Sequence, residues 1–260
     1  SGVASWLVAL AGGVLALQVV TLFLTGSRGP MVGVLAGLFF LALVEAARRR
    51  HKAAASALVG AALVGVLCVL ALNLGGDRLQ ALRDTPLLAR YSRLLDPDQN
   101  SSRVRTLIWD ANARLVSANP RIEFADGRAD PWRLLRPLVG YGPENLKTVF
   151  FRFYPPELAL AERRTVSADR SHNLGWDLLT MQGLLGLAVY LGLVGLLIHQ
   201  SLARLGLLAG RRDTVALLVA MGTGAVALCA ALAAWRGAGY LPLGTVAGAL
   251  CGLVAYLATA

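Results

Sequence analysis

Six long apolar runs dominate the chain. They cover about residues 3–24, 31–47, 53–74, 173–198, 214–235 and 243–260. Runs of this kind suit a membrane, because a helix needs roughly 20 apolar residues to cross a hydrocarbon core of about 30 Å. The pattern therefore predicts an all-α integral membrane protein, a multi-span helical bundle with three spans on each side of a long polar segment.

The polar segment, residues 75–171, is expected to form a domain of its own between residues 1–74 and residues 172–260. It holds too many Trp, Tyr, Phe and Leu residues for a disordered linker. Because the chain begins at Ser1 and enters an apolar run almost at once, we expect it to be the C-terminal part of a longer protein.

Within the polar segment, the spacing of apolar residues predicts helices. Leucines and a tyrosine recur at helical spacing over 77–96, which indicates amphipathic helix on the membrane surface. A second apolar stripe predicts a helix over 100–120, with Ser101 or Ser102 as its N-cap and Pro120 at its end. The segment is therefore expected to be a large, mostly helical loop.

Basic residues predict the orientation of the bundle. The short loops 48–52 and 200–213 are rich in Arg and Lys, and six spans place both on the same side. The positive-inside rule assigns that side to the cytoplasm. The turn that contains Arg28 and the long polar segment then face outward, toward the periplasm of a bacterial inner membrane.

The overall charge agrees with a membrane protein. The chain is 56% hydrophobic and carries a net charge of +10, with a mean hydropathy of +0.60. A basic soluble protein would suggest nucleic acid as a partner. Here the positive charge is better explained by loop orientation and by contact with anionic membrane lipids, so no nucleic-acid partner is expected.

Few polar residues are placed where they could carry chemistry on the outer side. His172 is the only histidine expected there, whereas His51 and His199 fall at the cytoplasmic ends of spans. A lone interfacial histidine can be structural or can act as a general base. The chain has no zinc-binding, P-loop or serine-hydrolase motif, and no metal is expected.

Several arginines share the outer side with His172. Arg28 lies in a short turn between two spans, and Arg103, Arg105 and Arg170 lie in the polar segment. Guanidinium groups keep their charge and bind phosphate with two parallel hydrogen bonds, so such a cluster suits a diphosphate-bearing lipid. The alternative is that these arginines only anchor the chain at the lipid headgroups.

Four short motifs in a fixed order give the chain a family resemblance. They are TGSRGP (25–30), SRVRTLIW (102–109), VGYGP (139–143) and SHN (171–173). After His172 and Asn173 come nine residues, then Gly183 and Gly186. Over about residues 20–200 this order resembles the O-antigen ligase and polymerase superfamily of membrane glycosyltransferases. Leu187 departs from the threonine that ligases often have next.

The resemblance implies a GT-C-like helical bundle with a large periplasmic loop and an activity. A glycan on undecaprenyl diphosphate is transferred en bloc to an acceptor hydroxyl outside the inner membrane, such as a growing glycan or the lipid A core. No cofactor is implied. By the same resemblance His172 is the general base, and Arg28 and Arg105 bind the diphosphate. The expected helpers are Arg103, Arg170, Asn173 and Gly142.

Three functions are compatible with these features. The first is an O-antigen ligase of lipopolysaccharide assembly, and the second is a polymerase or protein O-oligosaccharyltransferase of the same superfamily. The third is a polysaccharide or lipid transporter without catalysis. A transporter is expected to carry ionisable groups near the bilayer midplane, and the predicted spans are almost free of charge inside.

Overall fold

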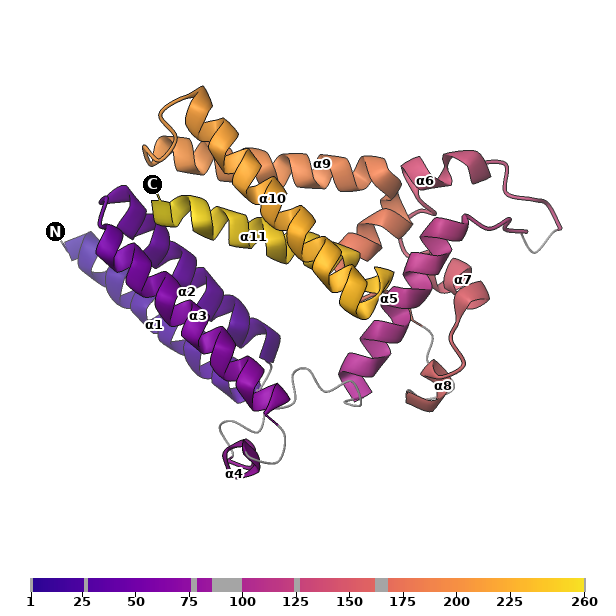
Figure 1. Ribbon diagram of the computed structural model, residues 1–260, viewed down its shortest axis with the longest axis horizontal. Helices are drawn as coiled ribbons and strands as arrows, with labels where there is room; N and C mark the ends of the chain where they lie inside the picture. Colours follow the sequence, from indigo (N-terminus) through magenta and orange to yellow (C-terminus); the bar gives the residue numbers. More distant parts are fainter. Residues whose placement is uncertain are drawn as a thin grey trace.

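The protein is a bundle of long helices with a cluster of shorter helices at one end (Figure 1). The computed structural model describes residues 2–25, 28–75, 79–85, 100–123, 127–161 and 168–259. Its six long apolar helices are α1 (Gly2–Thr25), α2 (Arg28–Arg48), α3 (Lys52–Leu74), α9 (Leu174–Arg204), α10 (Arg211–Arg236) and α11 (Leu241–Thr259). The predicted all-α, six-span membrane protein is confirmed.

Two helix boundaries differ from those that hydropathy predicts. Helix α2 begins at Arg28, not at residue 31, so Arg28 belongs to the first turn of the helix; its side chain lies outside the described residues. Helix α9 continues to Arg204, beyond the predicted end at 198. The reason is the same in both places: a helical backbone continues through polar residues at the membrane surface, where hydropathy falls.

Helices α10 and α11 form a closely packed antiparallel hairpin (Figure 1). Gly244, Gly248 and Gly252 follow one another at four-residue intervals along α11 and lie against the backbone of α10. Small residues at this spacing let helices approach closely in a membrane. Gly12 in α1 and Gly192 in α9, by contrast, face open space.

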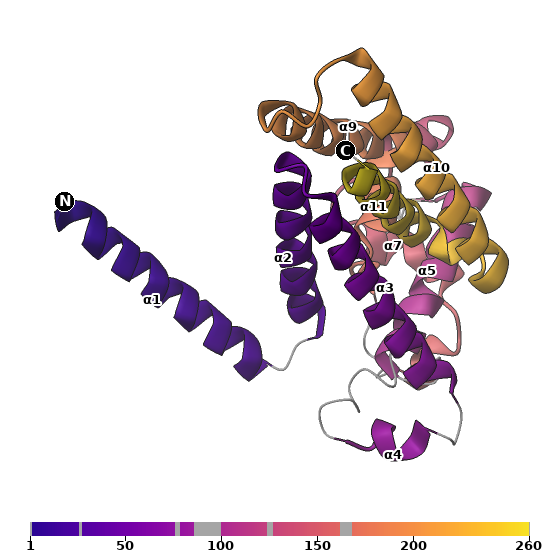
Figure 2. The same ribbon diagram turned by 60° about the vertical axis from the view of Figure 1, so that its left-hand side comes forward.

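Helix α1 stands apart from the other helices (Figure 2). Apart from Leu22, the described side chains of its apolar residues from Ser5 to Leu24 are exposed. In a bilayer such a surface contacts lipid.

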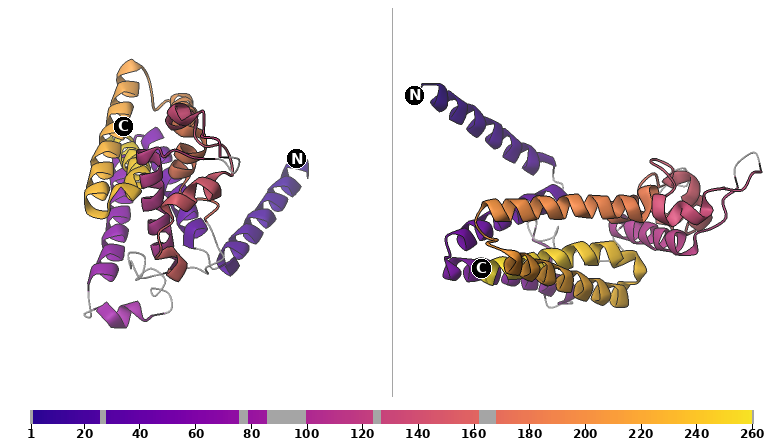
Figure 3. Two further views of the ribbon diagram at one scale, coloured as in Figure 1. Left: turned by 90° about the vertical axis from the view of Figure 1, so that its right-hand side faces the viewer. Right: turned by 90° about the horizontal axis from the view of Figure 1, so that it is seen from above.

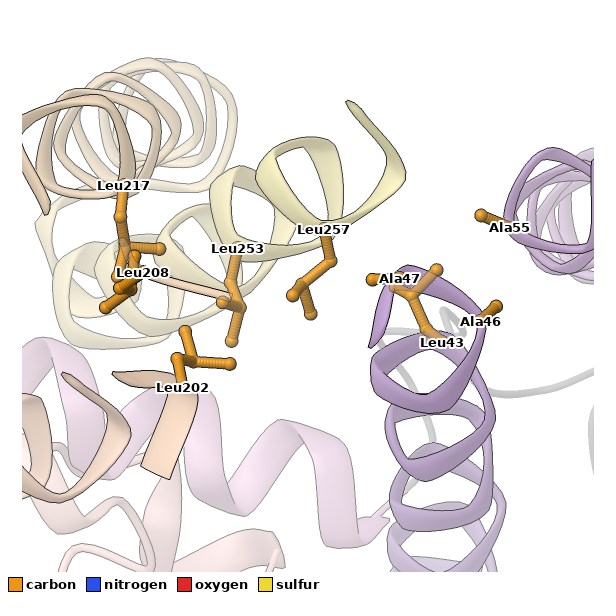
Figure 4. Close-up of a cluster of buried hydrophobic side chains, with 9 residues drawn as sticks. All are labelled: Leu43, Ala46, Ala47, Ala55, Leu202, Leu208, Leu217, Leu253 and Leu257. Atoms are coloured by element: carbon orange, nitrogen blue, oxygen red, sulfur yellow. The ribbon is translucent and has the colours of Figure 1, made fainter. Parts of the chain in front are cut away.

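The basic loops lie side by side at one end of the bundle, as predicted. A buried cluster there joins the end of α2, the start of α3, the α9–α10 turn and the end of α11 (Figure 4); its members are Leu43, Ala46, Ala47, Ala55, Leu202, Leu208, Leu217, Leu253 and Leu257. The Tyr256 hydroxyl donates to the Leu207 carbonyl at 2.9 Å and so fastens α11 to the α9–α10 turn. This arrangement leaves Arg28 and the N-terminus of α9 toward the opposite end.

Helix α4 (Gln80–Arg83) lies near the end of α3, where Arg83 Nε donates to the Leu72 carbonyl at 2.6 Å. The rest of the described segment between α3 and α9 forms a cluster of helices at the end of the bundle opposite the basic loops (Figure 3). The cluster comprises α5 (Asn100–Ala118), α6 (Arg136–Val139), α7 (Leu146–Phe150) and α8 (Leu158–Ala161), with the 3-10 turns η2 (Arg133–Leu135) and η3 (Phe151–Phe153). Its core packs the apolar stripe of α5 against α7 and α8.

The predicted helices of this segment are partly correct. Helix α5 ends before Pro120 as expected, but it begins at Asn100, so Ser101 and Ser102 lie in its first turn and not at its N-cap. The amphipathic helix expected over 77–96 is described only as the short α4; residues 86–99 lie outside the described part of the chain.

Helix α9 is broken at Gly183, and a turn from the cluster closes the break. Gly183 adopts φ 67° and ψ −167°, which interrupts the helical hydrogen bonds. The Tyr141 and Gly142 backbone N–H groups donate to the carbonyls of Thr180 and Met181 at 2.8 and 2.9 Å. The break therefore joins α9 to the loop after α6. It also divides α9 into a short piece of residues 174–182, the outer piece, which lies away from the basic loops, and a long spanning piece.

The close packing at Gly183 predicts that a methyl group added there lowers the stability of the fold. In Gly183→Ala, the left-handed backbone and overlap with the Leu138 carbonyl should lower Tm by about 2–8 °C, measured by thermal unfolding of the purified protein. The matched control is Gly192→Ala, in open space further along α9, which should leave Tm unchanged or raise it slightly, because alanine favours a helix. Equal Tm values for the two variants would contradict the role assigned to the break.

Candidate functional site

His172 lies between two residues that are fixed by the start of α9. Asn173 is the N-cap, and its Oδ1 accepts from the Gly175 and Trp176 N–H groups at 3.0 and 3.4 Å. Ser171 is fully buried, and its backbone N–H and its Oγ lie 2.8 and 2.7 Å from Asp177 Oδ1. Since both neighbours are held, the backbone between them has little freedom.

His172 itself is exposed in a left-handed conformation. Its φ is 54°, which is uncommon for a residue with a side chain. The imidazole makes no hydrogen bond with the part of the chain that the structure describes. The local fold thus exposes this imidazole, and neither ring nitrogen is bonded to a described residue.

Helix α5 packs against this stretch through Trp109. The indole Nε1 donates to the Ser171 carbonyl at 2.9 Å, and the ring meets Tyr240 edge to face at 5.3 Å between centroids. Arg105 precedes Trp109 by one helical turn and therefore shares its face of α5. Arg105 is exposed and forms no ion pair or hydrogen bond with a residue that the structure describes.

The turn between α10 and α11 completes the same junction. This turn is η4 (Ala238–Tyr240), and its Gly239 carbonyl accepts from Trp176 Nε1 at 2.7 Å. Gly239 packs against Asp110 so closely that a Cβ would overlap the carboxylate. Burial raises the pKa of Asp110, and the charge of Arg114 and the Gly239 N–H oppose that rise.

Buried polar contacts also link α5 to the outer piece of α9. Thr180 Oγ1 donates to Asn112 Oδ1 at 3.2 Å, and Asn112 Nδ2 donates to the Ile108 carbonyl at 2.9 Å. Both Asn112 and Thr180 are almost completely buried. The outer piece of α9 is thereby held on three sides: by α5, by η4 and by the turn at residues 140–142.

The turn at residues 140–142 is stabilised by an ion pair. Arg136 lies 2.7 Å from buried Asp130, donates to the Gly140 carbonyl at 3.0 Å and stacks over the Tyr141 ring. Its guanidinium lowers the pKa of Asp130, while burial raises the pKa of Tyr141. Gly142, an expected helper, contributes its backbone N–H to the closure of the α9 break.

The other predicted site residues lie in different surroundings. Arg170 forms an exposed ion pair with Glu144 at 2.8 Å, and Arg103 is exposed on α5. The side-chain oxygen of Asn173 is occupied by its capping role. Arg28 is at the start of α2, at the end of that helix away from the basic loops. In the described ranges, no three His, Cys, Asp or Glu side chains gather as metal ligands.

Sequence reasoning missed the residues that hold His172 in place. Ser171, Asp177 and Asp130 act through contacts between residues six positions apart, a spacing that belongs to neither helical nor strand periodicity. A weak signal was present at Asn173 and Asp177, because an Asn N-cap followed by an acidic first turn is typical of a helix start.

The fold and this junction define a class: a six-span helical membrane protein with a helical cluster that presents a histidine at one end of the bundle. The family model described as O-antigen ligase matches residues 13–191, a range that includes Arg28, Arg105, His172 and Gly183. The chain belongs to the O-antigen ligase family. Membership implies glycosyltransferase-like activity on glycan and lipid-linked substrates. No curated protein and no solved structure matches the chain.

The Asp130–Arg136 pair predicts how stability depends on pH. The folded pKa of Asp130 is lowered, so the pair stabilises the fold at neutral pH and loses this effect as pH falls through that pKa. Asp130→Asn should therefore cost about 1–3 kcal/mol at pH 7. Thermal unfolding of wild type and variant from pH 7 downward should show the two Tm values converging; a constant difference would contradict the assignment.

Proposed function

We propose that the protein transfers a glycan en bloc from undecaprenyl diphosphate to an acceptor hydroxyl, as an O-antigen ligase of lipopolysaccharide assembly. The observation that carries the proposal is the presentation of His172. Its imidazole is exposed between a buried serine and a helix cap, next to the face of α5 that carries Arg105.

The chemistry follows from that presentation. A neutral imidazole accepts the proton of the acceptor hydroxyl as its oxygen attacks the anomeric carbon. The bond from that carbon to the diphosphate oxygen breaks, and the diphosphate leaves with the electron pair. Attack opposite the leaving group inverts the anomeric centre.

The leaving diphosphate needs charge stabilisation more than protonation. Arg28 and Arg105 would supply it as fixed positive charge, with Arg103 as a further helper. Arg170 contributes less, because its guanidinium already pairs with Glu144. None of these steps requires a metal or a cofactor.

The direction of the bundle in the membrane is part of the proposal. The basic loops face the cytoplasm of a bacterial inner membrane by the positive-inside rule. His172 lies at the other end of α9, and it would then act at the periplasmic face, where the lipid-linked glycan and the acceptor meet.

A polymerase or a protein O-oligosaccharyltransferase is the second candidate. Leu187 favours it, because ligases often have threonine at that position. A non-catalytic transporter is less well supported. The break in α9 lies only nine residues past Leu174, and backbone N–H groups of the 140–142 turn fill it, so it offers no open ion site near the bilayer midplane.

The general-base role predicts the effect of removing the imidazole. His172→Ala should lower the transfer rate about 10²- to 10⁴-fold, measured with the full-length protein, lipid-diphosphate glycan and candidate acceptors. The control is His199→Ala, at the basic end of α9, which should transfer at the wild-type rate. Wild-type transfer by His172→Ala would rule out the general base.

The arginine roles predict impaired use of the donor. Arg28→Gln and Arg105→Gln should each slow transfer by roughly a hundredfold, as when a donor to a developing anion is removed. Arg114→Gln is the matched control, because nine residues place Arg114 on the opposite face of α5 from Arg105. Equal rates for Arg105→Gln and Arg114→Gln would contradict diphosphate binding by Arg105.

A further inference from the structure

A cavity at the basic end of the bundle takes no part in the proposed transfer. Its volume is about 360 Å³, and it opens between the α2–α3 turn, the α9–α10 turn and the end of α11. Its lining includes Arg48, Arg50, Leu207, Asp213 and Tyr256. The length of α9 places it on the order of 40 Å from His172.

The charge of this cavity is only partly compensated. Glu45 accepts two hydrogen bonds from Arg48 at 2.7 Å and one from Arg49 at 2.5 Å, so a single carboxylate serves two guanidinium groups. Asp213 Oδ2 accepts from the Ala209 N–H at 2.8 Å and forms no ion pair with a described residue. The cavity therefore keeps a positive potential.

Arg50 is the uncompensated cation. It forms no ion pair or hydrogen bond with any residue that the structure describes, although it lines the cavity. Its φ of 52° is a left-handed conformation, stabilised by the backbone bonds from Arg50 N to Ala47 O and from His51 N to Ala46 O. The turn thus fixes an exposed guanidinium at the rim of a hollow.

The cavity lies at the level along the bundle where lipid headgroups are expected. It lies where the apolar surfaces of α2 and α11 end, and Leu41 and Leu250 remain exposed along those helices. Acyl chains can lie on such surfaces while a phosphate reaches the arginines. Guanidinium groups bind phosphate with geometric specificity, and basic pockets between spans bind anionic headgroups.

We propose that this cavity binds the phosphodiester of an anionic phospholipid, with Arg50 as its main contact and Arg48 as the second. The lipid would stabilise the contacts among the two basic loops and the end of α11. This inference does not depend on the glycan-transfer reaction, because the cavity and the site of His172 lie at opposite ends of α9.

The experiment compares lipid binding by the full chain and two variants, by native mass spectrometry after exchange into phosphatidylglycerol or phosphatidylcholine. Arg50→Asn suits the left-handed backbone. It should weaken retention of phosphatidylglycerol roughly fivefold, as loss of one cation at a membrane surface does. The control Arg212→Gln removes a nearby cation that does not line the cavity, and it should retain the lipid as wild type does.

Inorganic phosphate is the competing probe. Competition by millimolar phosphate supports phosphate recognition with the free ion as a ligand, and its absence supports the phospholipid as the source. Equal losses in Arg50→Asn and Arg212→Gln would overturn the proposal in favour of diffuse surface charge. Equal retention of the two lipids by the wild type would overturn it as well.

Discussion

The closure of the α9 break at Gly183 is the constraint on which the end of the protein that carries His172 depends. A helix that loses its hydrogen bonds inside a membrane protein must find other partners for the freed carbonyls. Here the N–H groups of Tyr141 and Gly142 supply them, and the Asp130–Arg136 pair stabilises the turn that carries those groups. The break therefore joins the helical cluster to the bundle and redirects the first nine residues of α9.

The redirected piece of α9 determines how His172 is presented. It packs against α5 and against η4, and its first turn fixes Ser171 and Asn173 on either side of the histidine. Trp109 connects Ser171 to the α5 face that carries Arg105. Residues that are far apart in the sequence thus determine the surroundings of His172. The basic loops and their cavity lie at the other end of the molecule.

Most of the fold could be predicted from the sequence, because hydropathy determines membrane spans and charge determines which loops lie together. The helix starts at Arg28 and Asn100 could not be predicted, since capping residues and polar surface residues interrupt the hydropathy pattern there. Gly183 was recognised as part of a motif, but its left-handed backbone depends on contact with residues 140–142. The Asp130–Arg136 and Ser171–Asp177 contacts join residues six positions apart through turns of irregular backbone, and they leave no periodic signal.

The protein holds the backbone on both sides of His172, and we propose that the exposed imidazole is the proton acceptor of glycan transfer. The most direct test of this proposal is chemical rescue of His172→Gly, because glycine adopts the φ of 54° at this position without strain. The account predicts a variant that is folded and nearly inactive, whose transfer rate rises with added imidazole. Transfer by His172→Gly at the wild-type rate without imidazole would contradict the account.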